Sequence, residues 1–284
     1  YIPHLYNDLK PLGAVYTNFR IEEEGKTETN PGHSSMLTGT WQQIANDGSQ
    51  RPNKPTVFEY FRKELGSSII ENYAVAGKSK LNILSYSTDP DYGILYQAST
   101  SCSTLTDNQI YTNLLSIMAT FHPRLMIVNF PDTDVKGHTG VWSDYLNALT
   151  NADNLVYQLW QHIQGGDYGY TATNTTMFVT NDHGRHTTDF SGHGDDCDGC
   201  EHIMLLAIGR NVSQGVVIND LRFQIDLAPT IGDLLGFSTP QAVSTSLYQG
   251  PNPLPVELSS FTAKILKSGG VKLDWRTETE ISTF

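Results

Sequence analysis

Aspartate and histidine residues follow two apolar segments of the sequence at spacings that suit metal binding. Asp134 and His138 follow the first of these segments, and Asp182 and His183 follow the second directly. Carboxylates and imidazoles together suit zinc, and also manganese or iron. A single Asp–His pair after a strand usually only caps a loop through hydrogen bonds. Two such pairs, with His193 close behind them in the sequence, favour a metal site over capping.

Thr29 is a candidate nucleophile because it stands ahead of an Asn-Pro-Gly turn and of a short helix expected after that turn. The amides at a helix N-terminus favour an anion there. A threonine hydroxyl is a poor nucleophile unless a base or a metal removes its proton. The alternative is that Thr29 is only an N-cap or turn residue. The residues alone leave both interpretations open.

The elements that must position these residues are continuous apolar strands separated by helical patterns. Residues 125–130, 176–180 and 203–208 are apolar runs, and residues 146–163 repeat apolar side chains at helical spacing. Such strands indicate a largely parallel sheet with helices on both faces, which is an α/β fold. Ligands bind beyond the carboxyl ends of parallel strands, where the Asp and His residues stand.

Composition divides the chain into a large domain over residues 1–249, a linker over 250–255 and a shorter module over 256–284. The linker is rich in Pro and Gly. Residues 256–263 and 271–277 alternate with the two-residue period of strands. We expect them to open a small β-sandwich-like module that is cut off at the end of the sequence.

Charge and hydropathy exclude several classes of function. The 284 residues are 38% apolar and carry a net charge of −12 with His neutral. That charge disfavours long-range attraction to nucleic acid or to anionic membranes. Bound cations can still invert the local field and attract a small anionic substrate. No apolar run reaches about 18 residues, so the sequence predicts no membrane-spanning segment.

Two of the three cysteines, Cys197 and Cys200, form a Cys-x-x-Cys motif in a loop rich in Asp and Gly. One such motif cannot build a four-thiolate zinc site. A thioredoxin-type motif would open a helix after a strand. We therefore expect a local disulfide or a structural loop clip. The acidic residues around the motif are expected to form a solvated loop; they are Asp189, Asp195, Asp196, Asp198 and Glu201.

Four segments of the chain resemble, in the same order, the motifs of the alkaline phosphatase superfamily. They are similar to its Thr or Ser nucleophile four residues before a His, its Asp-x-x-Gly-His motif, its Asp-His-Gly motif and its later His motif. The segments are residues 29–33, 129–140, 179–184 and 191–194. The resemblance covers roughly residues 1–240. It is greatest to type I phosphodiesterases/nucleotide pyrophosphatases and to cofactor-independent phosphoglycerate mutases.

The resemblance implies two divalent metal ions, zinc with manganese as the alternative, and a nucleophilic Thr29. It implies one metal held by Asp134, His138 and His193. It implies that Asp182 and His183 help to hold the other metal, toward which Thr29 bridges. His193 is preferred to His202 for its Gly-His-Gly context, and Asp134 to Asp132 for its four-residue spacing to His138.

The second metal site of that superfamily also takes an Asp at the end of the first strand. Asp8 is no candidate because it lies in an expected helix, so we expect the strand and its Asp to precede Tyr1. The histidines His33, His162 and His186 are interpreted as packing or surface residues, and Lys136 as an exposed lysine.

The function implied is hydrolysis of phosphate monoesters or diesters through a phosphothreonine intermediate. The Thr29 segment lacks the arginine of the sulfatase Cys/Ser-x-Pro-x-Arg motif, which disfavours a sulfatase. Residues 41–122 are too few for the inserted domain of phosphoglycerate mutases. The alternatives are a non-catalytic metal-binding surface protein on the same fold, or a sulfatase or phosphonate hydrolase of the superfamily.

The C-terminal module resembles one found near the ends of proteins that Bacteroidetes-type bacteria export. It implies a secreted, periplasmic or cell-surface location. The expected partner is a small phosphorylated substrate rather than nucleic acid. An ordinary accessory β domain is the alternative interpretation of the same segment.

Overall fold

The computed structural model describes residues 1–22, 25–247, 258–265 and 271–277. The chain separates into two compact units, Tyr1–Leu247 and Tyr248–Phe284, each of which is described by itself. The first unit contains the strands β1 (Gly13–Arg20), β2 (Asn72–Ala76), β3 (Ser99–Cys102), β4 (Leu125–Asn129), β5 (Thr176–Thr180), β6 (His202–Gly209), β7 (Val216–Ile218) and β8 (Arg222–Phe223). Its α-helices are α1 (Thr29–Thr38), α2 (Val57–Leu65), α3 (Asp107–Phe121), α4 (Asp132–Gly137), α5 (Trp142–Gly165), α6 (Asp198–Glu201) and α7 (Leu227–Leu235), and a π-helix η1 (His4–Leu9) precedes β1.

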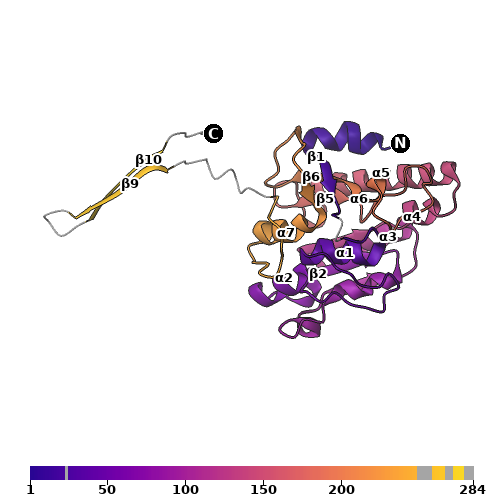
Figure 1. Ribbon diagram of the computed structural model, residues 1–284, viewed down its shortest axis with the longest axis horizontal. Helices are drawn as coiled ribbons and strands as arrows, with labels where there is room; N and C mark the ends of the chain where they lie inside the picture. Colours follow the sequence, from indigo (N-terminus) through magenta and orange to yellow (C-terminus); the bar gives the residue numbers. More distant parts are fainter. Residues whose placement is uncertain (23–24, 248–257, 266–270, 278–284) are drawn as a thin grey trace. The chain divides into compact units, whose positions relative to one another are not determined.

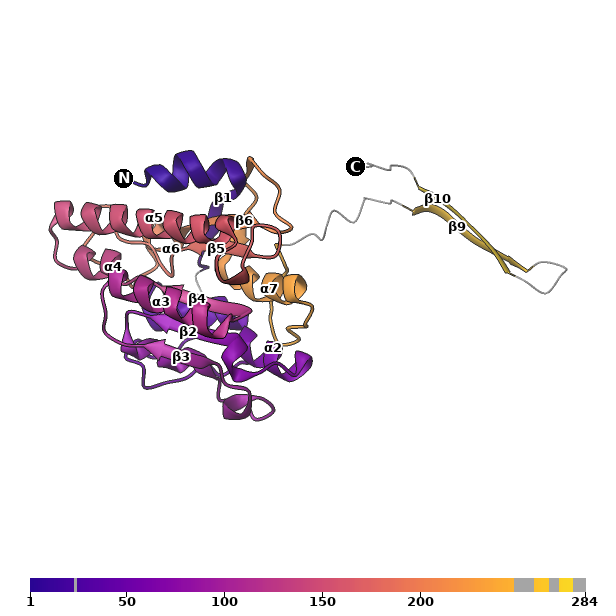
Figure 2. The ribbon, with the colours of Figure 1, turned by 180° about the vertical axis from the view of Figure 1, so that it is seen from behind.

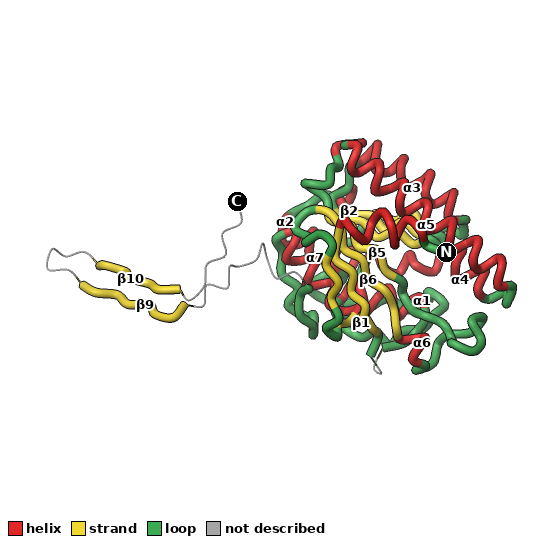
Figure 3. Tube along the Cα trace, turned by 90° about the horizontal axis from the view of Figure 1, so that it is seen from above, coloured by secondary structure: helices red, strands yellow, loops and turns green. Residues whose placement is uncertain are grey.

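Two sheets form the centre of the first unit. The larger has the order β5-β6-β1-β7, with β8 also beside β1, and the smaller has the order β3-β2-β4. The smaller sheet is parallel throughout, and β1 is parallel to β7 and β8. Figure 3 shows β5, β6 and β1 side by side. The predicted α/β class with a parallel-rich sheet and helices is confirmed.

Strand β6 departs from the parallel arrangement that we expected, because it runs antiparallel to both β5 and β1. A parallel partner needs a crossover of a dozen or more residues, usually a helix. The segment between β5 and β6 contains only the four-residue α6 among its described elements. It returns the chain in the opposite direction and remains beside the end of β5.

Strands β4 and β5, which precede the two Asp–His pairs, belong to different sheets within the described residues. They still lie near one another, because Ile127 of β4 and Phe178 of β5 pack against the same core cluster. The polar residues that follow the two strands can therefore meet without a shared ladder.

Helices cover both faces of the larger sheet, and the side chains of β6 show why. Leu206 packs with Trp160 of α5 on one face, whereas its neighbour Leu205 packs with Met36 of α1 on the other. Successive side chains of a strand point to opposite faces, so a continuous apolar run needs cover on both. Figure 1 shows η1 and α5 along one side of the larger sheet, with α1 and α7 on the other. Figure 2 shows the same ribbon from the opposite side, where α5 can be followed along its length.

Helix α1 approaches the end of β5 closely. A Cβ atom on Gly32 would lie 2.5 Å from the carbonyl oxygen of Asp182, so only glycine allows this contact. The helix ends at Gly39, whose φ of 70° is the left-handed conformation that closes many helices. The Asn-Pro-Gly sequence thus belongs to the first turn of the helix, and it brings that turn against β5.

The described residues of the second unit form the antiparallel pair β9 (Leu258–Ile265) and β10 (Val271–Thr277). These strands occupy most of the two alternating segments of the sequence. The expected linker over 250–255 and the rest of the expected sandwich-like module lie outside the described residues. Among the described helices of the chain, none has both the length and the apolarity needed to cross a membrane.

The carboxyl group of Asp107, buried at the start of α3, makes stability depend on pH. Burial raises the pKa of Asp107 to about 7, against the hydrogen bond from the Asp132 N–H. The folded chain therefore keeps this proton to higher pH than the unfolded chain, whose Asp pKa is about 3.9. The free energy of unfolding should fall as pH rises from about 4 to about 7 because of this group.

We expect Asp107→Asn to lose less stability than the wild type between about pH 5 and pH 8, because the amide keeps the acceptor and cannot ionise. Urea unfolding at both pH values measures the difference. Replacement of the exposed Asp91 by Asn is the matched control. Parallel pH profiles for wild type and Asp107→Asn would contradict the assignment.

Candidate metal centre

Asp134, His138 and His193 lie together beyond the carboxyl end of β4. Asp134 Oδ1 is 3.3 Å from His138 Nε2 and 3.5 Å from His193 Nε2. The two imidazole Nε2 atoms are 3.1 Å apart. Asp134 lies in the short helix α4, whose C-cap is His138, and His193 comes from the loop between β5 and β6. The structure thus brings together the three side chains predicted to share one metal.

Backbone carbonyls fix the orientation of the imidazoles of His138, His193 and His183. Each ring places its Nδ1 at hydrogen-bond distance from a carbonyl oxygen, which can only accept, so each Nδ1 carries the proton and each Nε2 keeps its lone pair. The carbonyls belong to Ser191, Thr27 and Gly184 respectively, each 2.9 Å away. This is the usual arrangement of metal-binding histidines. The facing lone pairs of His138 and His193 repel unless a cation lies between them.

His183 fits the same centre. Its ring stacks on that of His193 with 3.8 Å between centroids, and its buried Nε2 has no hydrogen-bond partner among the described residues. Donor atoms of Asp134, His183 and His193 all lie within 4.8 Å of one another. Burial lowers the pKa of His183, which keeps the ring neutral and available as a ligand. The donor set therefore fits a divalent cation such as zinc.

Asp182 lies on the other side of His183. Its Oδ2 is 3.7 Å from His183 Nε2 and 3.2 Å from His33 Nδ1. Burial opposes the charged form of Asp182, yet the hydrogen bond from His33 and the Lys78 ammonium hold its pKa well below the usual range. The carboxylate is thus ready to bind a cation. The assignment of Asp182 and His183 to a second metal stays a prediction, since His183 also groups with Asp134 and His193.

Thr29 is the first residue of α1, and it is not the N-cap. Glu28 has that position, and the Thr29 side chain faces Lys78, whose Nζ lies 3.2 Å from Thr29 Oγ1. The same Nζ lies 2.5 Å from Asp134 Oδ2. One ammonium group therefore connects the candidate nucleophile to the candidate metal ligands, and the N-cap interpretation of Thr29 is wrong.

Arg185 is the second cation of the centre. Its guanidinium contacts the Asp134 carboxylate and donates to the Asp134 carbonyl at 2.8 Å. A Cβ atom on Gly137 would lie 2.3 Å from that guanidinium, so glycine makes room for it. Although burial disfavours a charged Asp134, the Lys78 ammonium, which also donates a hydrogen bond to it, holds the pKa of Asp134 well below its usual range.

The remaining candidates from the sequence lie elsewhere. Asp132 accepts the backbone N–H of Asp107 at the start of α3, and His202 Nε2 lies 2.9 Å from the carbonyl oxygen of Thr17. The structure adds three residues that the sequence did not nominate, which are Lys78, Arg185 and His33. Only His33 had a signal in the sequence, because it follows Thr29 by four residues.

Sequence comparison matches the chain to a family model and to known proteins. The family model described as the metalloenzyme superfamily matches residues 87–231. The 2,3-bisphosphoglycerate-independent phosphoglycerate mutase of Desulforudis audaxviator (strain MP104C) is 32% identical over 126 residues. That alignment covers 43% of this chain and 23% of the enzyme, so the chain spans about a quarter of the length of this curated relative.

Solved structures share the fold at low sequence identity. The phosphonate monoester hydrolase SpPMH from Silicibacter pomeroyi has a TM-score of 0.61 at 13% identity, over 93% of this chain and 74% of that one. A protein in the alkaline phosphatase superfamily from Vibrio parahaemolyticus has a TM-score of 0.61 at 14% identity, over 86% and 63%. The predicted resemblance to the alkaline phosphatase superfamily is confirmed by these matches together.

We expect Asp134→Asn to lower the bound divalent metal by about one equivalent after dialysis, because the amide is a weaker ligand and carries no charge. Elemental analysis by mass spectrometry measures the metal content. Asp132→Asn is the matched control, two residues away, and should retain wild-type metal. Equal metal content in the two variants, both folded by circular dichroism, would contradict the assignment.

Proposed function

We propose that this chain, which belongs to the metalloenzyme superfamily, is a metal-dependent phosphoric ester hydrolase with Thr29 as its nucleophile. The observation that carries the proposal is the position of Lys78. Its Nζ contacts both Thr29 Oγ1 and Asp134, so the hydroxyl lies within one side chain of the metal ligands. The alternative of a non-catalytic metal-binding protein gives no reason for a buried threonine hydroxyl at this place.

Divalent cations would be held by Asp134, His138 and His193 in one position, and by Asp182 with His183 in the other. When bound, they supply positive charge to the phosphoryl oxygens and to the leaving oxygen. Zinc suits the Asp and His donors best, and manganese is the alternative. The chain itself must orient the hydroxyl, hold the ligands and neutralise charge.

In the reaction, Thr29 Oγ1 forms a bond to phosphorus as the bond to the leaving oxygen breaks in line with it. Water then hydrolyses the phosphothreonine. The hydroxyl proton passes, overall, to the leaving oxygen, and the Lys78 ammonium is placed to stabilise the negative charge on Oγ1 before the bond to phosphorus forms. Thr29 is buried, with 1% of its surface exposed, so its hydroxyl is held within the packed first turn of α1.

His33 fixes the nucleophile relative to the carboxylate of Asp182. Its Nδ1 lies 2.8 Å from the carbonyl oxygen of Thr29 and 3.2 Å from Asp182 Oδ2. The first turn of α1 and the end of β5 are therefore joined by one buried ring. An error of about 1 Å in such an alignment can cost about a hundredfold in rate.

The substrate class rests on charge and on the family resemblance. Lys78 and Arg185, together with two divalent cations, would match the negative charge of a phosphate ester. Phosphonate monoesters are the second candidate, because a phosphonate monoester hydrolase shares the fold over most of this chain. The two classes are separated by measuring rates on p-nitrophenyl phosphate, bis-p-nitrophenyl phosphate and p-nitrophenyl phenylphosphonate.

We expect Thr29→Ala to lower kcat on the best of these substrates by about a thousandfold, because the covalent step is lost. Metal content should stay at the wild-type level. Thr29→Ser is the matched control, since it keeps a hydroxyl at the same atom, and should retain measurable turnover. Acid quenching of wild type during turnover should trap phosphothreonine at residue 29. Wild-type turnover by Thr29→Ala would overturn the proposed mechanism.

We expect Lys78→Met to lower kcat by about a hundredfold, the loss usual for one preorganised group that stabilises developing charge. Lys136→Met is the control, because Lys136 is exposed on the neighbouring helix α4 and should leave kcat within about twofold. Steady-state rates with added metal measure both. Similar losses in the two variants would show that only general positive charge is involved.

A further inference from the structure

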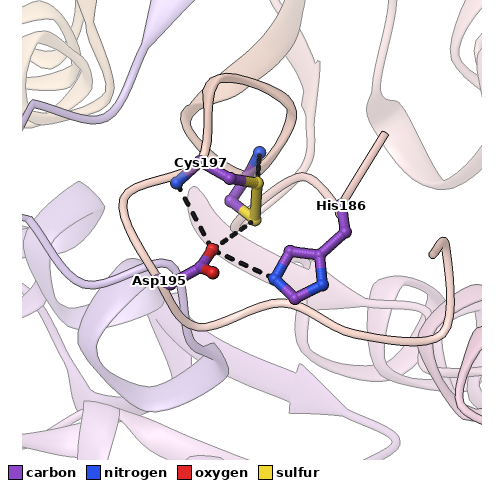
Figure 4. Close-up of side chains that lie close together, drawn as sticks. His186, Asp195 and Cys197 are labelled. Atoms are coloured by element: carbon purple, nitrogen blue, oxygen red, sulfur yellow. Dashed lines mark hydrogen bonds and ion pairs between the residues drawn. A yellow bond between two sulfur atoms is a disulfide. The ribbon is translucent and has the colours of Figure 1, made fainter. Parts of the chain in front are cut away.

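A second group of metal-ligating side chains lies in the segment between β5 and β6, outside the centre described above. His186, Asp195, Cys197 and Cys200 each place one donor atom within 4.8 Å of the others. Figure 4 shows His186, Asp195 and the disulfide between Cys197 and Cys200 turned toward one another. A tetrahedral zinc ion with bonds of about 2.0–2.3 Å holds its donors about 3.5 Å apart. The four donors are therefore near enough to reach such an arrangement once the S–S bond is broken and the two sulfurs move apart.

We propose that these four side chains form a second type of metal site, which binds Zn²⁺ when the Cys197–Cys200 disulfide is reduced. The disulfide and the cation are alternative cross-links within the same loop. Reduction by an external dithiol takes up two electrons and two protons at the two sulfurs, and the dithiol is oxidised to its own disulfide. Metal binding then releases both thiol protons as the two sulfurs bond to the cation.

Asp195 stands at the centre of the group and is exposed, as the sequence predicted. Its Oδ1 lies 3.0 Å from His186 Nε2 and 3.1 Å from Cys200 Sγ, and it accepts the Cys197 N–H at 3.3 Å. A carboxylate, an imidazole and two sulfurs suit zinc, whereas magnesium and calcium prefer oxygen ligands alone. The four donors therefore favour zinc over magnesium and calcium.

The backbone holds the two sulfurs ready for this role. The N–H of Cys200 donates to Cys197 Sγ at 2.9 Å, a hydrogen bond that favours the thiolate form of a reduced Cys197. The N–H groups of Gly184 and Arg185 donate to the carbonyl oxygens of Cys200 and Gly199, at 2.7 Å and 2.9 Å. The loop is thus bonded to the segment that carries His183, and it does not depend on the S–S bond alone.

The loop that carries this group is also hydrogen-bonded to the candidate catalytic centre, through Thr27. The Thr27 hydroxyl donates to the Asp195 carbonyl at 2.8 Å, and His193 Nδ1 donates to the Thr27 carbonyl at 2.9 Å. Thr27 precedes the candidate nucleophile Thr29 by two residues. Either cross-link, the disulfide or the metal ion, would therefore hold His193 and Thr29 in the same positions relative to one another.

Cobalt binding to the whole chain tests the site, because thiolate ligands give Co²⁺ an intense charge-transfer absorption that oxygen and nitrogen ligands do not. The chain is freed of metal, then titrated with Co²⁺ after oxidation or after reduction by a phosphine. The disulfide oxidises the phosphine, which takes an oxygen atom from water and becomes the phosphine oxide. We expect the reduced chain to bind one equivalent more than the oxidised chain, with the sulfur absorption. Cys197→Ser/Cys200→Ser should bind as the oxidised chain does.

Further variants separate this site from other sources of signal. Cys102→Ser should keep the absorption, because Cys102 is buried elsewhere. His186→Ala should weaken the cobalt affinity of the sulfur site at least tenfold. Asp134→Asn should leave the absorption unchanged, so this test does not depend on the proposed hydrolase. No added equivalent on reduction, or wild-type affinity in His186→Ala, would overturn the proposal.

Discussion

The geometry of the metal centre depends on the carboxylate of Asp134. Lys78 reaches it from the segment after β2, Arg185 from the segment after β5, and His193 from farther along the same loop. A buried carboxylate costs several kcal/mol unless it is paired and hydrogen-bonded. The protein meets this cost with side chains from three segments, and that requirement brings the segments together. These protein contacts therefore help to hold the ligand loops in place.

Main-chain atoms impose the second constraint. The carbonyls of Thr27, Ser191 and Gly184 set the tautomers of the three imidazoles, so the loops must follow one path for the lone pairs to face inward. Gly32 and Gly137 serve the same end, because a side chain at either position would separate elements that now touch. The chemistry of the centre thus depends on residues that carry no reactive group.

The sequence predicted the parts of this site that are local and missed those that are not. The strand over 176–180 and the residues after it follow from apolar patterning and from a motif of three residues. Lys78 and Arg185 join the centre only through the tertiary fold, and nothing in their neighbours distinguishes them from surface cations. The direction of β6 was also missed, because a buried strand is continuously apolar in either direction. Asp195 is exposed, as predicted, but its contacts with His186 and Cys200 had no signal in the sequence, because these partners are nine residues before it and five after it.

The two sheets bear on the expectation that a further strand with an Asp completes the second metal site. Within the described residues, β4 pairs only with β2, and β5 pairs only with β6, so each has one edge without a ladder. Asn129, at the end of β4, approaches His33 Nε2 at 3.3 Å, while His33 Nδ1 approaches Asp182 just after β5. One imidazole thus spans the carboxyl ends of the two free edges. His33 therefore joins two strand ends that share no ladder, and the further Asp stays a prediction that no described residue tests.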